Sequence, residues 1–116
     1  MRRLGKRLAA FGHAFRGIVL FLREAHGRIH ATVTVAIFLM GIWLGVSATD
    51  WALLVICITL VLAAEAINTA VERVVDLVSP QWHPLARDAK DLAACGVLIT
   101  AIGAVVVGVM VFLPYL

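Results

Sequence analysis

The sequence predicts an all-α membrane protein with three transmembrane helices and an amphipathic N-terminal helix on the membrane surface. Of the 116 residues, 63% are hydrophobic and only 15% are charged, whereas a soluble domain is near half apolar and a quarter charged. All ten Lys and Arg residues lie within residues 1–28 and 73–90. The rest of the chain contains three apolar runs that approach or exceed the roughly 20 residues needed to cross a bilayer. A chain of this length forms one domain, residues 1–116.

Residues 1–28 form a basic N-terminal segment in which apolar residues recur at helical spacing. These apolar residues are Leu4, Leu8, Phe11, Phe15, Ile18 and Leu22. Most of the basic residues lie on other faces, so the pattern predicts an amphipathic helix on the anionic inner leaflet. Gly5, Gly12 and Gly17 weaken this helix. The alternative is a solvated basic leader.

Three membrane helices are expected at residues 29–48, 51–76 and 85–115, with a short turn over residues 49–51 between the first two. That turn contains no Lys or Arg, whereas the N-terminal segment and the loop before residue 90 are basic. The positive-inside rule therefore places the N-terminus and the second loop in the cytoplasm and the C-terminus outside.

Small residues on two of the expected spans favour a homo-oligomer. Gly41 and Gly45 form a GxxxG pair in the first span. The third span has a small residue at every fourth position: Gly96, Thr100, Ala104 and Gly108. Such stripes let helices approach closely in lipid, and three spans alone make a thin bundle.

The second span carries a polar stripe at its cytoplasmic end. Glu65, Asn68, Glu72 and Asp76 fall within about 80° of one another on a helix, and Thr69 borders them. Glu65 lies inside the apolar run, where a carboxylate costs about 2.5–3.5 kcal/mol to insert. A group that expensive is a functional candidate. The alternative is a buried polar residue that ties helices together.

The remaining acids of this region suggest a cation site. Glu72 and Asp76 are four residues apart and repel each other unless a divalent cation or a basic side chain lies between them. Glu24, at the cytoplasmic end of the first span, is a further oxygen ligand. Carboxylate and phosphate oxygens are the ligands that Mg²⁺ prefers. The alternative for each acid is an ion pair with a nearby Arg.

Other polar residues have simpler interpretations. Trp82 is suited to interface anchoring or to stacking on a base, and Lys90 to holding a phosphate. His26 and His30 have the spacing of metal ligands, but no third ligand is evident and both are interpreted as interfacial. The chain has no GxxxxGK[ST], GxSxG or HExxH motif. The residues alone leave an enzyme and a proton-coupled or structural membrane subunit both open.

The motif E-x-x-N-x-x-x-E-x-x-x-D of residues 65–76, followed by Lys90-Asp91, resembles the bacterial diacylglycerol kinase family. The resemblance covers nearly the whole chain, including Glu24-x-x-x-Arg28. Arg28-Ile-His30 and the run D-L-V-S-P-x-x-H-P-L-A from residue 76 are similar to the undecaprenol kinase branch. It implies a homotrimer in the bacterial cell membrane, with composite active sites between subunits and no nucleic-acid partner.

The resemblance also implies an activity, namely transfer of the γ-phosphoryl group of ATP, with Mg²⁺, to a membrane lipid alcohol at the cytoplasmic leaflet. Undecaprenol is the expected acceptor and diacylglycerol the alternative. Ala94 stands where the diacylglycerol branch tends to have a small hydroxyl residue, which favours the polyprenol.

Roles follow residue by residue from the same resemblance. Glu65 is the expected general base and binds the lipid together with Asn68 and Arg28, while Glu24 and Glu72 hold the metal. The expected nucleotide-binding residues are Lys6, His13, Glu24, Glu72, Gln81, Trp82, His83, Lys90 and Asp91. Between Gly17 and Glu24 the chain is one residue shorter than the family pattern.

Overall fold

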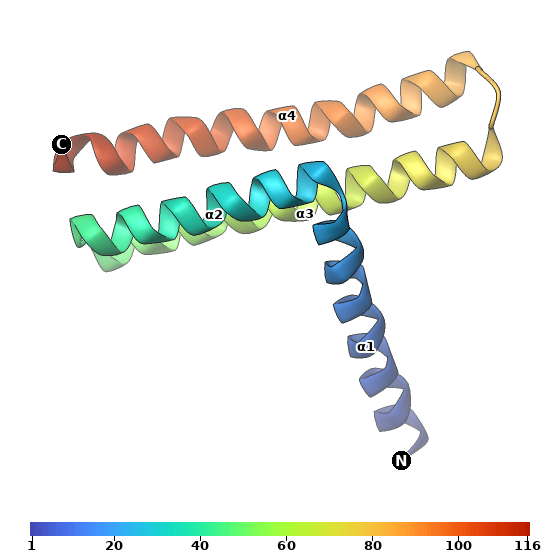
Figure 1. The fold of residues 1–116 in the computed structure, drawn as a ribbon, viewed down its shortest axis with the longest axis horizontal. Coiled ribbons are helices and arrows are strands. Elements are labelled where there is room, and N and C mark those ends of the chain that lie inside the picture. The colour runs from blue at the N-terminus through green and yellow to red at the C-terminus, as the bar shows by residue number, and fades with distance from the viewer.

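The structure, a computed structural model, describes residues 1–116 and contains helices only (Figure 1). The helices are α1 (Arg2–Arg23), α2 (Ala25–Leu44), α3 (Ala48–Val78) and α4 (Pro84–Phe112), followed by a 3₁₀ turn, η1 (Leu113–Tyr115). Helices α2, α3 and the α4–η1 unit are long and apolar enough to cross a membrane. The prediction of an all-helical fold with three candidate membrane helices is confirmed.

Helix α1 is continuous despite its three glycines, and it projects steeply away from the other helices (Figure 1). None of its residues is buried, so its apolar and basic side chains are accessible to a membrane or to another subunit. The helix itself is therefore observed. Its placement on a membrane surface remains a prediction.

The corner between α1 and α2 is formed by Glu24, whose backbone is extended (φ −77°, ψ 141°). Gly27 is required there, because a Cβ at this position would lie 1.9 Å from the carbonyl oxygen of Phe21. The Arg28 guanidinium donates a hydrogen bond to the Arg23 carbonyl at 2.9 Å. Glu24 is thus held at a sharp bend.

The turn between α2 and α3 lies earlier than the sequence suggested, and the prediction of a turn at residues 49–51 is wrong. Gly45 ends α2 in the left-handed conformation (φ 63°, ψ 46°). The Ser47 hydroxyl then accepts a hydrogen bond from the Asp50 backbone N–H at 3.1 Å and caps α3. The terminating glycine and this serine cap place residues 48–50 in the first turn of α3.

The C-terminus closes this end of the bundle. The Tyr115 hydroxyl donates to Asp50 Oδ2 at 2.7 Å and accepts from the Ser47 backbone N–H at 3.1 Å. Next to these bonds is a small cluster of buried hydrophobic residues: Val46, Leu54 and Val111. The turn and the end of α4 are therefore joined by both polar and apolar contacts.

Most apolar side chains face outward, and only 7 of 116 residues are buried. This is the pattern of helices solvated by lipid or by other subunits rather than by water. Gly41 packs against Trp51, where an added Cβ would lie 2.7 Å from the indole ring, and Trp51 stacks on Phe38 with centroids 5.4 Å apart. The GxxxG pair is thus used inside the chain, since Gly41 contacts α3 and Gly45 forms the turn.

Helices α3 and α4 form a long hairpin that extends past the α1–α2 corner to the loop at residues 79–83 (Figure 1). Glu65 is about 17 residues from the start of α3, or roughly 25 Å along the helix. The hydrocarbon core of a bilayer is about 30 Å thick. Glu65 therefore lies toward the loop end of the span, where the hydrocarbon gives way to the interface.

Candidate active site

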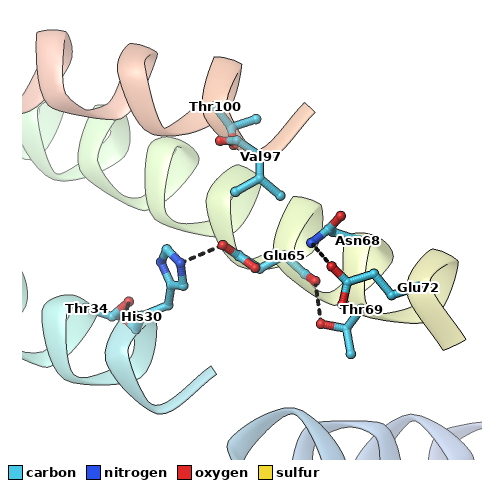
Figure 2. Close-up of polar contacts among 8 residues, drawn as sticks. All are labelled: His30, Thr34, Glu65, Asn68, Thr69, Glu72, Val97 and Thr100. Carbon is cyan, nitrogen blue, oxygen red and sulfur yellow. Dashed lines mark hydrogen bonds and ion pairs between the residues drawn. The ribbon is translucent and has the colours of Figure 1, made fainter. Parts of the chain in front are cut away.

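Glu65 is the only buried polar or charged residue of the chain, at 7% exposure. Its Oε1 lies 2.7 Å from Nε2 of His30 on α2 (Figure 2). The Thr69 hydroxyl donates to the Glu65 backbone carbonyl at 3.1 Å, and the carboxylate has no partner other than His30. A carboxylate near the hydrocarbon is thus stabilised by one imidazole.

His30 was not predicted as a site residue; it was interpreted as interfacial. Two signals could have identified it. An ionisable side chain within an apolar span usually pairs with another. In addition, His30 and Glu65 lie at similar distances along the chain from the α2–α3 turn, so antiparallel packing brings them to one level.

Asn68 lies one turn from Glu65 and is only partly satisfied. Its Nδ2 donates to Glu72 Oε1 at 3.5 Å, a long hydrogen bond (Figure 2). Its Oδ1 is buried and has no hydrogen-bond partner. A buried acceptor without a donor costs free energy, so this oxygen is suited to accept a bond from a ligand hydroxyl.

Two ion pairs lie toward the loop end of the hairpin. Glu24 at the corner pairs with Arg73 of α3 at 2.7 Å, and Asp76 pairs with Lys90 of α4 at 2.6 Å. Lys90 is thus a basic side chain beside Asp76, which is one of the two alternatives considered for relieving the repulsion between Asp76 and Glu72. Glu72 itself has no cationic partner within 4 Å.

Within one chain, no three His, Cys, Asp or Glu side chains form a metal-binding cluster. The carboxylates of Glu24 and Glu72 have the donor chemistry for Mg²⁺, but Glu24 already contacts Arg73. This donor set fits a cation held mainly by phosphate oxygens rather than a site made by protein alone. Mg²⁺ binding by these two residues remains a prediction.

The expected nucleotide-binding residues of the loop and α4 lie together at the end of the hairpin. Trp82 is exposed, and the Arg87 guanidinium lies 5.7 Å from its ring centroid. His83 caps α4, its Nδ1 accepting from the Leu85 backbone N–H at 3.1 Å. The other members of this group are Gln81, Lys90 and Asp91.

Within one chain, three predicted site residues lie apart from the residues with which they were expected to act. Lys6 and His13 belong to α1, the helix that projects from the others (Figure 1). Neither side chain makes an ion pair. Arg28 bonds to the Arg23 carbonyl and contacts neither Glu65 nor Asn68. Their predicted roles therefore depend on a second subunit or on a ligand.

Two apolar grooves flank the paired His30 and Glu65. One, of about 800 Å³, lies between α1, α2 and α3, and its lining includes Thr34, Ala66 and Thr69. The other, of about 580 Å³, lies between α2, α3 and α4 and is lined in part by His30 itself. Hydrocarbon chains can thus approach the pair from the membrane.

The sequence is similar to those of known proteins. Residues 12–112 match the family model described as prokaryotic diacylglycerol kinase. The undecaprenol kinase of Bacillus subtilis (strain 168) is 35% identical over 114 residues, covering 97% of this chain and 93% of that protein. A diacylglycerol kinase of Synechocystis sp. is 40% identical over 109 residues (92% and 62%). The diacylglycerol kinase of Escherichia coli (strain K12) is 32% identical over 100 residues (85% and 82%).

These relatives are kinases, so the interpretation as an enzyme is confirmed, and the proton-coupled or structural subunit is not retained. The three apolar helices and the family together make it an integral membrane protein. The chain therefore belongs to the prokaryotic diacylglycerol kinase family and is a lipid kinase.

Proposed function

We propose that the chain transfers the γ-phosphoryl group of MgATP to undecaprenol at the cytoplasmic leaflet of a bacterial cell membrane. The observation that carries the proposal is the buried carboxylate of Glu65, held by His30 beside apolar grooves and on the same helix as Glu72 and Asp76. The relative named undecaprenol kinase, aligned over nearly its full length, supports the polyprenol. Relatives named diacylglycerol kinase make diacylglycerol the alternative acceptor.

Glu65 is the general base of this reaction. It accepts the proton of the lipid hydroxyl as the oxygen forms a bond to the γ-phosphorus and the bond to the β-phosphate oxygen breaks. Asn68, one turn away, helps to position this carboxylate or the lipid. Phosphoryl transfer depends mainly on positioning and on neutralising charge, so one oriented carboxylate provides the base that the alcohol needs.

The charged end of the hairpin binds the nucleotide in this proposal. Glu24 and Glu72 hold the Mg²⁺, which neutralises phosphate charge, and Lys90 moves from Asp76 to the phosphates. The loop tryptophan stacks on the base. The other residues placed around the nucleotide are Gln81, His83, Asp91, Lys6 and His13.

A homotrimer with sites shared between subunits explains why some expected site residues do not meet the others within one chain. Helix α1 projects from its own bundle, so its Lys6 and His13 are free to reach a neighbouring subunit (Figure 1). The small-residue stripe of α4 is open, since an added Cβ at Gly96 or Gly108 meets nothing within 4 Å. An N-terminus in the cytoplasm follows from the basic flanks.

The proposal is tested with purified protein, radiolabelled ATP and Mg²⁺ in mixed micelles containing equal mole fractions of undecaprenol or diacylglycerol. We expect kcat/KM for undecaprenol to exceed that for diacylglycerol by at least about tenfold, a difference of about 1.4 kcal/mol in transition-state binding. The control omits Mg²⁺, which should abolish transfer to either lipid. Equal rates or a preference for diacylglycerol would refute the assigned acceptor.

A further inference from the structure

We infer that His30 is a positioning residue that holds the Glu65 carboxylate in the orientation needed to receive the lipid proton. This inference rests on the proposed function, in which Glu65 is the base. His30 lies on α2, whereas the acidic stripe lies on α3. The inference is based on the short contact between the His30 and Glu65 side chains (Figure 2).

The geometry of the contact restricts Glu65 strongly. The two atoms, His30 Nε2 and Glu65 Oε1, are 2.7 Å apart, which is the length of a charge-assisted hydrogen bond. An ionised carboxylate can only accept, so the proton of this bond must be on Nε2. The contact therefore occupies Oε1 and leaves Oε2 free for the lipid hydroxyl.

Within the chain, His30 is the only side chain that donates a hydrogen bond to the Glu65 carboxylate. The Glu65 side chain is 9% exposed and has no other polar partner. Without His30, the long Glu side chain would be free to change rotamer, and its carboxylate would lie near hydrocarbon without a donor. A displacement of about 1 Å in a reacting group can cost on the order of 100-fold in rate.

A purely structural role would make the same contact a tie between α2 and α3. However, these helices are already joined at the outer end by Trp51 against Gly41, and Glu24 at the start of α2 pairs with Arg73 of α3. The contact between His30 and Glu65 lies between the Gly41–Trp51 contact and the Glu24–Arg73 ion pair. Its loss should therefore reduce turnover more than it reduces stability.

Two substitutions separate the hydrogen bond from the volume of the ring. His30→Phe keeps the ring but cannot donate, whereas His30→Gln places an amide N–H near the position of Nε2. His26→Phe is the matched control, because His26 lies one turn earlier on α2, is exposed and makes no contact with Glu65. Each protein is assayed for kcat, KM for MgATP, thermal unfolding and oligomer content in detergent.

We expect His30→Phe to lower kcat by about 10- to 100-fold with KM for MgATP unchanged, and to lower the unfolding midpoint to a smaller extent, because Glu65 loses its only donor. His30→Gln should recover most of the loss, and His26→Phe should behave as the parent protein. In a Glu65→Gln background, His30→Phe should cost nothing further, because a positioning residue acts only through the group that it positions.

Other results overturn the inference. Native kcat in His30→Phe, equal loss in the Phe and Gln variants, or a loss that follows a fall in oligomer content would each refute positioning by His30. An undiminished loss in the Glu65→Gln background would show that His30 acts independently. Native turnover in Glu65→Gln alone would instead refute the base assignment on which the inference rests, so the two failures are distinguishable.

Discussion

Glu65→Gln tests the proposed mechanism most directly, because the substitution removes the base and retains the shape. Glu65 is 7% exposed and its Oε1 lies 2.7 Å from His30 Nε2. The amide oxygen of glutamine can accept the same bond, so the contact between α2 and α3 should survive. The amide cannot accept the proton of the lipid hydroxyl.

The expected effects on rate and stability have different sizes. Loss of a general base costs about 10²–10⁴-fold in rate, so kcat should fall by that factor. Insertion scales assign a charged side chain about 2.5–3.5 kcal/mol at the bilayer centre. Glu65 lies toward the loop end of its span, so its removal relieves a smaller cost. We therefore expect the unfolding midpoint to stay the same or rise.

The assay measures kinase turnover, thermal unfolding and detergent-resistant oligomer content on one preparation. Asp88→Asn is the matched control, because it makes the same acid-to-amide change where Asp88 only pairs with the adjacent Arg87 at 3.6 Å on an exposed surface. The control should retain native turnover. Turnover within about threefold of the parent in Glu65→Gln, or a loss explained by dissociated oligomers, would refute the assignment of Glu65 as base, since base loss costs at least about 10²-fold.

Three further predictions concern the metal, the packing and the topology. Glu72→Gln should raise KM for MgATP about tenfold or more, because loss of even an outer-shell partner of a metal ligand costs about 10- to 100-fold in affinity, and an unchanged KM would remove Glu72 from the metal site. Gly41→Val should destabilise the fold by about 1–3 kcal/mol in thermal unfolding, because its Cβ would lie 2.7 Å from the Trp51 ring, whereas Gly103→Val, with open space, should not. A reporter fused after Leu116 should be active only outside the cytoplasm, and activity in the cytoplasm would contradict the three-span topology.

The sequence predicts the number and type of helices well, because long uncharged apolar runs have few structural alternatives. The helix ends were less predictable. The turn was expected at residues 49–51 from the first polar residues after the apolar run, but the left-handed Gly45 and the Ser47 cap place it earlier. Local capping geometry decided this boundary, and hydropathy does not report it.

The candidate site was likewise predictable in part. The stripe from Glu65 to Asp76 was predictable because a single helix sets its geometry. The partners were not, because the contacts of Glu65 with His30 and of Asp76 with Lys90 depend on how neighbouring helices are aligned. Periodicity places residues on a face, whereas pairing between helices requires their relative position.

The partners of the four acids bear on how the charged end would bind the nucleotide in the proposed function. Glu65 is held by an imidazole, and Glu24 and Asp76 by Arg73 and Lys90. A fourth acid, Glu72, receives only a long bond from an amide. It is therefore the carboxylate whose charge is least compensated. A cation brought by phosphate would gain most at that position, and its arrival would weaken the hold of the acids on the two basic side chains. These would then be free to meet phosphate, so binding of the metal and of the nucleotide would favour each other.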